Sequence, residues 1–264
     1  MKPTVVITRP SGPYAGAQKL AQRLAQHGFE PFEFPVLSCE RLPLAEEARR
    51  LVQTTLETKG AWIAFLSPTA VHVFRDLIRE EFPSSSSLEG ISLASQGKGT
   101  AEAIQECFGR QPDFVPSVFI AEEFAREFAP KIRAGQRVLV PQSADGRDLL
   151  GPTLRLQGKD AHSFSLYALL PVPVDAERLK ALQELSNEST FVVFMSPSAV
   201  RAAVEQAGAT LINKRVVSVG PITSQAIRKA GLTLWREARE HSEDGVLSTL
   251  LSDPYGSRGS RCSP

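Results

Sequence analysis

The chain contains the segment Phe65-Leu66-Ser67-Pro68-Thr69-Ala70-Val71. About half the chain length later it repeats this segment as Phe194-Met195-Ser196-Pro197-Ser198-Ala199-Val200. Each copy stands where an apolar run meets a helical pattern. A repeat with so long a period is a whole domain rather than one unit of a solenoid. It predicts two similar α/β lobes, each with the same helix start at the same end of its sheet, and a ligand cleft between the lobes.

Composition supports two cores and excludes a global attraction to nucleic acid. The 264 residues are 42% hydrophobic, which is enough for two domains of ordinary size. Thirty Lys and Arg residues nearly cancel 29 Asp and Glu residues, so the net charge is +1. A near-neutral protein has no broad field for a polyanion. An anionic small molecule would therefore be held by local donors.

The cysteines and the apolar runs indicate where the protein works. Cys39, Cys107 and Cys262 are scattered without metal-ligand spacing, and the four histidines form no cluster, so we expect a reducing compartment and no metal site. The first residues enter a strand directly and do not resemble a signal peptide. No apolar run reaches about 18 residues, the length that a membrane span needs. We expect a cytoplasmic protein that binds neither membrane nor nucleic acid.

Apolar runs of strand length alternate with amphipathic stretches, which is typical of parallel sheets covered by helices on both faces. The expected strands are Thr4–Thr8, Phe29–Leu37, Ala61–Leu66, Ile91–Ala94, Asp113–Val115, Arg137–Val140, Ala161–Tyr167, Thr190–Met195, Arg215–Val219 and Leu232–Trp235. The expected helices are Ala15–His27, Ala45–Thr58, Pro68–Glu81, Gly99–Cys107, Ala121–Ala129, Asp145–Leu156, Ala176–Leu185, Pro197–Gly208, Pro221–Ala230 and Gly245–Leu251. By composition, Pro83–Ser87 is a loop and Ala168–Pro173 a stiff connector.

Counting strands predicts that one lobe is inserted into the other. Only three strands follow Pro173, too few for a second complete sheet, whereas the first βαβ unit has a strand and a helix to spare. We expect residues 1–36 and 174–252 to form a split lobe and residues 42–164 to form an inserted lobe. The chain then crosses twice, in linker strands at 35–43 and 165–173. The polar residues 253–264 are expected to be a disordered tail.

The repeated Ser-Pro pairs are candidate anion-binding sites. Ser67-Pro68 and Ser196-Pro197 place a preferred N-cap residue before a proline that suits the first helical turn. One interpretation is that they only start helices well. The other is that the free N–H groups of the helix start bind an anion at the carboxyl ends of the strands. Repetition in both lobes favours the second interpretation.

A second pair of helix starts shares the pattern Gly-x-x-Thr. Gly97 and Thr100 form one copy, and Gly220 and Thr223 form the other. Both copies follow a strand and precede a helix. A tight turn alone explains the pattern, and backbone amides with a hydroxyl that hold an anion explain it as well. Neither copy is a phosphate-binding P-loop or a dinucleotide fingerprint, so a dinucleotide cofactor is not expected.

Polar residues at other strand ends complete the candidate site. Arg9 follows the first strand, and Ser143 and Arg147 follow its counterpart at Arg137–Val140; a guanidinium there suits a carboxylate. Tyr167 ends a strand beside the expected cleft, and its phenol is a candidate proton donor. Surface arginines and an interface aromatic are the plainer interpretations. No Gly-x-Ser-x-Gly elbow and no Cys–His dyad is visible by spacing, so the residues alone name no reaction.

Together these motifs resemble the uroporphyrinogen-III synthase family. The resemblance runs from Val5-Val6-Ile7-Thr8-Arg9-Pro10, through both Ser-Pro segments, to Val219-Gly220-Pro221-Ile222-Thr223-Ser224-Gln225-Ala226. It includes Gly146-Arg147-Asp148-Leu149-Leu150, and Tyr167 before a linker that contains proline. Leu66 and Met195 stand where the family often has threonine, and Thr69 and Ser198 stand where it often has asparagine.

The resemblance implies a fold and an activity. The fold is two α/β lobes joined by a two-stranded linker, one lobe split by insertion of the other. The activity is cyclisation of hydroxymethylbilane to uroporphyrinogen III, with loss of water and inversion of ring D, and without a cofactor. Tyr167 would assist departure of the hydroxyl group. Substrate carboxylates would be bound by Arg9, Ser67, Thr100, Ser143, Arg147, Ser196, Ser198, Gly220 and Thr223.

Two other functions fit the pattern of lobes. A two-lobed binding protein would close on an anionic ligand without chemistry, although such proteins often carry a signal peptide. A two-lobed glycosyl transferase would need a nucleotide-sugar signature, and none is evident. We expect a monomer, because no long exposed apolar helix requires a partner, and transient contact with the enzyme that supplies the unstable substrate is compatible with it.

Overall fold

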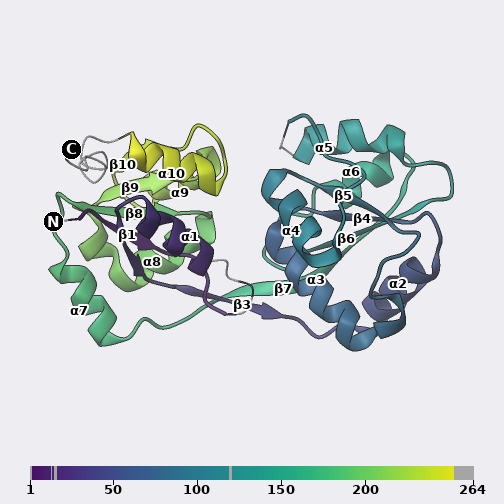
Figure 1. Cartoon of the computed structure of the whole chain (residues 1–264), viewed down its shortest axis with the longest axis horizontal. Helices are drawn as coiled ribbons and strands as arrows, with labels where there is room; N and C mark the ends of the chain where they lie inside the picture. The colour runs from purple at the N-terminus through teal and green to yellow at the C-terminus, as the bar shows by residue number, and fades with distance from the viewer. Residues whose placement is uncertain (1, 13, 15–16, 119–120, 253–264) are drawn as a thin grey trace, which may run out of the picture. The chain divides into compact units, whose positions relative to one another are not determined.

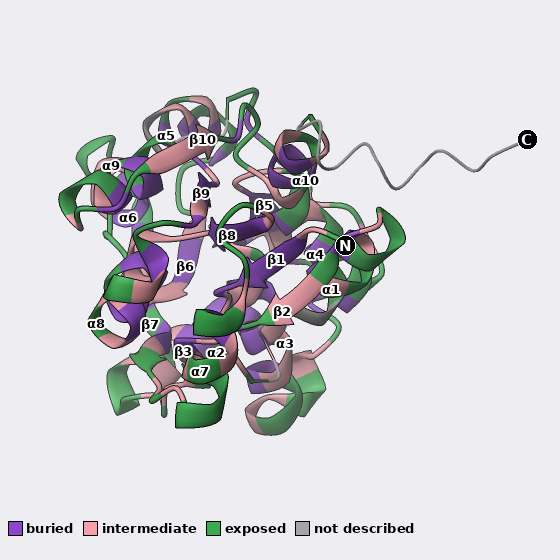
Figure 2. Cartoon of the chain, turned by 90° about the vertical axis from the view of Figure 1, so that its left-hand side faces the viewer, coloured by how far each residue is buried: buried purple, intermediate pink, exposed green. Residues whose placement is uncertain are grey.

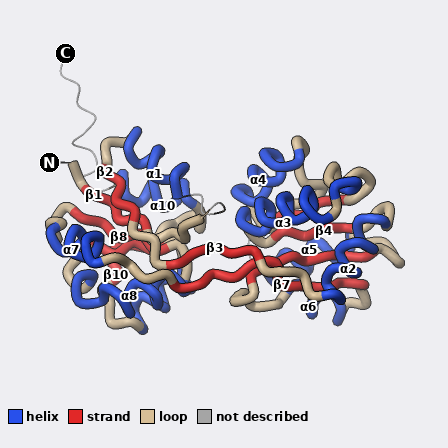
Figure 3. The backbone as a smooth tube through the Cα atoms, turned by 90° about the horizontal axis from the view of Figure 1, so that it is seen from below, coloured by secondary structure: helices blue, strands red, loops and turns tan. Residues whose placement is uncertain are grey.

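The computed structural model describes residues 2–12, 14, 17–118 and 121–252. Contacts divide the chain into two compact units, Met1–Cys39 with Leu169–Pro264 (unit 1) and Glu40–Ala168 (unit 2). The chain therefore passes between the units inside β3 (Leu37–Arg41) and again inside β7 (Asp160–Pro171). Within each unit, strands lie between layers of helices (Figures 1 and 3).

Unit 1 is built on a parallel five-stranded sheet whose strands come from both ends of the chain. Its order is β10 (Leu234–Glu237), β9 (Arg215–Ser218), β8 (Thr190–Phe194), β1 (Thr4–Ile7) and β2 (Glu30–Glu33). The central strands β1 and β8 are buried along their whole length, and the edge strands β2 and β10 are only partly covered (Figure 2). Burial on both faces explains their continuous Val, Ile and Phe runs.

Alternate residues of β1 enter two cores in unit 1. Val5 and Ile7 pack with α1 (Ala17–Gln26) and α10 (Glu243–Leu251) on one face of the sheet. Val6 faces the opposite way, into a cluster with α7 (Ala176–Glu184), α8 (Pro197–Leu211) and α9 (Pro221–Lys229). The period of two follows from strand geometry, and helices on both faces are what a parallel sheet requires.

Unit 2 has a second five-stranded sheet in the order β3, β7, β6 (Arg137–Ser143), β4 (Trp62–Phe65) and β5 (Ser92–Ser95). The pairs β7–β6, β6–β4 and β4–β5 are parallel. Its α-helices are α2 (Glu46–Glu57), α3 (Pro68–Glu81), α4 (Lys98–Phe108), α5 (Ala121–Phe128) and α6 (Leu150–Leu156), with 3-10 turns at η1 (Pro83–Ser85) and η2 (Ala129–Lys131). In one of its cores Phe114, Phe124 and Phe128 stack on one another, and Trp62 packs edge-on against Phe128.

The two sheets share a core of four strands in the same order, β9-β8-β1-β2 in unit 1 and β5-β4-β6-β7 in unit 2, and differ in the fifth strand, which is β10 beside β9 in unit 1 and β3 beside β7 in unit 2. In both, a Ser-Pro helix start follows one central strand (β4 or β8), and a Gly helix start follows its neighbour (β5 or β9). On the other side lie β6 and β7 in unit 2, and β1 and β2 in unit 1. The α/β fold class with two similar parallel-sheet lobes is therefore confirmed.

Several details of the predicted elements are wrong. The single extended segment expected at Phe29–Leu37 is divided between β2 and β3, with residues 34–36 outside both strands. The strand expected at Asp113–Val115 is a single bridge between Ala94 and Phe114, because the chain leaves the sheet edge after one residue. The helix expected from Asp145 begins only at Leu150, since a turn closed by the hydrogen bond from Gly146 N–H to Ser143 C=O comes first.

Two further differences concern a connector that contains proline and a serine-rich loop. The predicted connector at residues 168–173 is strand through Pro171, and the pairing continues as Val172 N–H donates to Val36 C=O at 3.1 Å. The loop predicted at residues 83–87 contains the turn η1. The predicted tail, residues 253–264, lies outside the described residues. The expected lobe limits of 1–36 with 174–252 and 42–164, the linker strands at 35–43 and 165–173, and the cleft between the lobes stay predictions.

Candidate functional site

The Ser-Pro start of unit 2 holds its serine in two hydrogen bonds. Ser67 is the N-cap of α3, and its Oγ accepts a hydrogen bond from the N–H of Ala70 at 3.1 Å. The same Oγ lies 3.1 Å from the phenol oxygen of Tyr167. Two residues that the sequence predicts for the site, far apart in the chain, are thus in direct contact.

The Ser-Pro start of unit 1 has the same cap and a different neighbour. Ser196 is the N-cap of α8, and its Oγ accepts from the N–H of Ala199 at 3.2 Å. The hydroxyl of Ser198 lies 3.0 Å away from that of Ser196. Capping by the serines is therefore a property of both units, whereas the aromatic hydroxyl is seen beside Ser67 only.

The Gly-x-x-Thr starts have no side-chain cap. Gly97 precedes α4 and Gly220 precedes α9, and at neither start does a side chain of the cap residue accept a hydrogen bond from the first turn. Thr100 and Thr223 lie in the first turns with 5% and 3% of their surface exposed. Within the described residues, neither threonine hydroxyl has a hydrogen-bond partner. Because the first N–H groups of a helix have no partner inside it, these two starts offer free donors and a positive potential to an anion.

The carboxyl end of β6 adds a further hydroxyl in unit 2. Ser143 lies opposite Tyr167 in the register of β6 and β7, and the C=O of Tyr167 accepts from Ala144 N–H at 2.8 Å. The Oγ of Ser143 is buried and has no partner among the described residues. Buried polar atoms are normally hydrogen-bonded, so this hydroxyl is one that a bound polar group would satisfy.

The two candidate arginines differ in their surroundings. Arg9 is partly buried after β1 and forms an ion pair with Glu243 in the first turn of α10. Arg147 is exposed on the turn after β6 and makes no ion pair within the described part of the chain. Arg147 is thus available to a carboxylate as it stands, whereas Arg9 would have to exchange Glu243 for one.

The structure brings the predicted residues to one edge of each sheet. In unit 2, Ser67, Thr100 and Ser143 belong to the ends of parallel strands or to the helices that follow them, whereas Tyr167, expected to end its strand, lies within β7 opposite Ser143. In unit 1 the carboxyl edge carries Arg9, Ser196, Ser198, Gly220 and Thr223. In open parallel sheets this edge is where ligands bind.

Sequence patterns missed several contacts at these edges. The hydroxyl of Thr8 donates to Val193 C=O at 2.8 Å and ties the ends of β1 and β8 together. Ser218, Ser224 and Glu237 form a hydrogen-bonded chain beneath the start of α9. The short polar residues in the motif around Gly220 are a signal for such a network, but only the fold shows the partners.

A Cys–His contact also escapes any spacing rule. The Sγ of Cys107 lies 3.2 Å from Nδ1 of His72, on the neighbouring helix α3. Burial raises the pKa of the Cys107 thiol, and the nearby Arg75 guanidinium only partly opposes this. The thiol therefore stays protonated near neutral pH, which is not the state of a nucleophilic cysteine.

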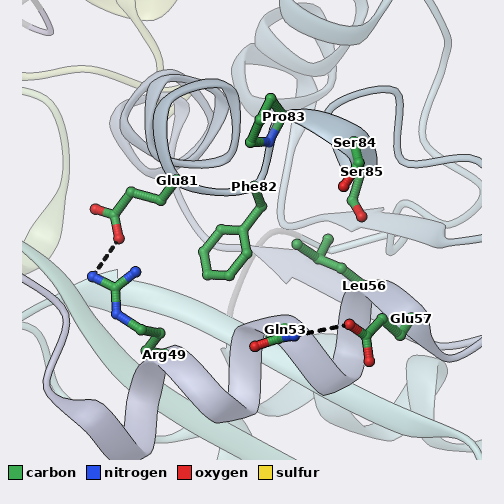
Figure 4. Close-up of a pocket in the computed structure, with 9 residues that line it drawn as sticks. All are labelled: Arg49, Gln53, Leu56, Glu57, Glu81, Phe82, Pro83, Ser84 and Ser85. Carbon is green, nitrogen blue, oxygen red and sulfur yellow. Dashed lines mark hydrogen bonds and ion pairs between the residues drawn. The ribbon is translucent and has the colours of Figure 1, made fainter.

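A depression of about 300 Å³ lies away from the candidate residues. It is lined by α2, the C-terminal end of α3 and η1, and the ion pair between Arg49 and Glu81, at 2.7 Å, lies at one side of it (Figure 4). Among the described residues, no three His, Cys, Asp or Glu side chains gather as a metal site. In the same part of the chain, none of the helices has the length and hydropathy of a membrane span.

The fold and its paired helix starts define a two-lobed α/β protein with parallel sheets. A family model described as "Uroporphyrinogen-III synthase HemD" matches residues 18–248, so the chain belongs to the uroporphyrinogen-III synthase family. It is 28% identical over 232 residues to a candidate uroporphyrinogen-III synthase of Methanocaldococcus jannaschii, covering 86% of this chain and 89% of that one. The family is one of tetrapyrrole biosynthesis.

A second relative and a solved structure agree with the family. The chain is 23% identical over 248 residues to the porphyrin biosynthesis protein HemD of Ruminiclostridium josui, covering 94% of this chain but only 48% of that longer protein. The crystal structure of the uroporphyrinogen-III synthetase from Helicobacter pylori matches with a TM-score of 0.64 at 17% identity. It covers 96% of this chain and 99% of that one, and this likeness supports the fold.

Proposed function

We propose that this chain is a uroporphyrinogen-III synthase, which converts hydroxymethylbilane to uroporphyrinogen III with loss of water and inversion of ring D. The observation that carries the proposal is membership of the family together with hydroxyl groups and free helix N-termini at the carboxyl edge of each sheet. The acetate and propionate groups of the substrate are matched by these donors. Local donors also explain how a chain of net charge +1 binds a polyanion.

The binding residues would act by positioning. We assign the side-chain carboxylates of the substrate to Thr100, Ser143 and Arg147 in unit 2, with Ser67 beside them. The matching set in unit 1 is Arg9, Ser198, Gly220 and Thr223, with Ser196 beside them as the N-cap of α8. A linear tetrapyrrole held curled, with its two ends close together, closes faster than a freely rotating one. Closure at the substituted carbon of ring D then competes with the spontaneous closure that gives the type I isomer.

Tyr167 is the proposed proton donor. The C–O bond of the hydroxymethyl group breaks, and the leaving oxygen takes a proton from the phenol and departs as water. Ser67 lies 3.1 Å from the phenol oxygen and can orient its proton. Ring closure returns a proton, so the reaction releases water without net oxidation or reduction. We therefore infer a cofactor-independent carbon–oxygen lyase.

An isomer-resolved assay tests this proposal. Freshly made hydroxymethylbilane is supplied to the protein, the product is oxidised to porphyrin, and the type I and type III isomers are separated. We expect mostly type III, formed faster than the spontaneous product. Type I alone, at the spontaneous rate, would overturn the proposal and leave the alternative of a binding protein without catalysis, which a tetrapyrrole-binding titration would then examine.

A further inference from the structure

The imidazole of His241 packs directly on the glycine that begins α9. His241 lies in the turn between β10 and α10, and a Cβ atom placed on Gly220 would come within 2.9 Å of its Cδ2 and 3.3 Å of its Nε2. Gly220 has a φ of 171°, an extended conformation that any residue adopts. The requirement for glycine here comes from the imidazole, which occupies the space of a side chain.

The ring of His241 is open to a ligand. His241 is exposed, and within the described residues it takes part in no hydrogen bond or ion pair. Glu243, two residues further on, is paired with Arg9, and the Oγ of Ser242 accepts from Gly245 N–H. The neighbouring polar groups thus have partners of their own. An imidazole always carries at least one N–H donor, whether it is neutral or protonated.

The helix start beside this ring has the properties of a carboxylate site. Pro221 has no N–H, so the free donors of the first turn are the amides of Ile222 and Thr223. The Thr223 side chain, in the same turn, is 97% buried, and its hydroxyl has no partner in the described part of the chain. The start of α9 therefore combines two free amides and a threonine hydroxyl with an unpaired imidazole packed on its N-cap glycine.

We propose that His241 is a further substrate-binding residue, which donates a hydrogen bond to the side-chain carboxylate held at the start of α9. This inference rests on the proposed function. The turn between β10 and α10 would then take part in binding the substrate. His241 does not take part in the chemistry, so its loss acts on KM and not on kcat.

The first test compares His241→Ala with a matched histidine. His27 is also exposed, but it lies after α1, at the opposite edge of the unit 1 sheet, so His27→Ala is the control. We expect His241→Ala to raise KM about tenfold, the effect of losing one hydrogen bond to a charged group, with kcat within about twofold. His27→Ala should leave both constants unchanged. An unchanged KM in His241→Ala would overturn the inference.

A binding titration separates this inference from the proposed function. Uroporphyrin III, a stable octacarboxylate, is titrated against wild-type protein, His241→Ala and His27→Ala, and the dissociation constants are compared. We expect about tenfold weaker binding for His241→Ala only. Absence of type III product from the wild-type protein would reject the proposed function, whereas equal dissociation constants would reject the role of His241.

Gly220→Ala tests the contact itself. The added methyl group would displace the imidazole, so this variant should also raise KM in the wild-type background. In the His241→Ala background the same change should add less than about twofold, because the ring that it displaces is absent. Fully additive effects of the two substitutions would contradict a shared role.

Discussion

Two kinds of helix start lie at the carboxyl edges of the two sheets. We expect the Ser-Pro starts to stabilise the fold and the Gly starts to bind the substrate. At the Ser-Pro starts of α3 and α8, the serine oxygen accepts a hydrogen bond from an N–H group of the first turn. At the Gly starts of α4 and α9, the N–H groups of the first turn have no side-chain cap. Capping therefore explains why the Ser-Pro motif is repeated. The free N–H donors lie at the starts of α4 and α9, which follow the neighbouring strands β5 and β9.

The largest effect is expected where the two Ser-Pro starts differ. Tyr167→Phe keeps the ring and removes the hydroxyl beside Ser67, so it should lower kcat about tenfold, below the usual contribution of a general acid because positioning supplies much of the rate. Quench-flow or steady-state measurement of type III product checks this.

Ser67→Ala is the companion variant, since it keeps the phenol and removes the cap. It should lower the free energy of unfolding with a smaller loss of kcat than Tyr167→Phe. Full turnover in Tyr167→Phe would remove the tyrosine from the mechanism.

The two serine caps should matter equally for stability. Ser67→Ala and Ser196→Ala should each lower the free energy of unfolding by about 1 kcal/mol, the usual cost of losing an N-cap. Urea unfolding of both variants measures this. Ser67→Thr and Ser196→Thr retain a capping oxygen and should recover most of the loss. Ser198→Ala, which leaves the Ser196 cap in place, should stay near wild type.

The smallest effect is expected at the opposite edge of the unit 2 sheet. Burial tends to raise the pKa of Asp160, but hydrogen bonds from Arg137 and His162 outweigh it and hold that pKa below its ordinary value of 3.8. The ionised carboxylate therefore stabilises the fold above about pH 4, and this contribution disappears as the pH falls through the lower folded-state pKa.

Asp160→Asn should flatten the acid limb of the stability curve and leave activity unchanged. The loss at neutral pH should be small, since the side chains of Arg137 and Asp160 are 31% and 46% exposed and solvent screens the pair. Urea unfolding between pH 2 and 7 checks it. A change in KM would show that binding is not confined to the carboxyl edges.

Much of the fold can be predicted from the sequence, because helix-capping residues, proline positions and hydrophobic periodicity indicate the same elements. The start and end of α3 at Pro68 and Glu81 follow from an N-cap serine, a proline and helical periodicity, and the structure has the same bounds. The prediction of a strand at Asp113–Val115 is wrong, because a short apolar run does not show whether a partner strand pairs with it along its length. The predicted helix start at Asp145 is wrong, because the turn closed at Gly146 takes the place of the first helical turn.

The sequence predicts which residues belong to the candidate site, but it does not predict the contacts between them. Motif and strand-end positions indicated Ser67 and Tyr167, yet their contact depends on the register of β7 beside β6 and β4. The pairing of Arg9 with Glu243 and the packing of His241 on Gly220 join segments that are distant in the sequence. Such contacts follow from tertiary packing, for which a single sequence carries no local signal.

The most direct test of the division between capping and binding compares Thr223→Val with Ser196→Ala in unit 1. Valine keeps the shape of Thr223 and removes a hydroxyl that makes no hydrogen bond within the described residues, so stability should hold while kcat/KM for type III product falls about tenfold. Ser196→Ala should show the reverse, a loss of about 1 kcal/mol in stability with KM nearly unchanged. If instead Ser196→Ala weakens substrate binding and Thr223→Val does not, the serine starts bind the substrate and the account is contradicted.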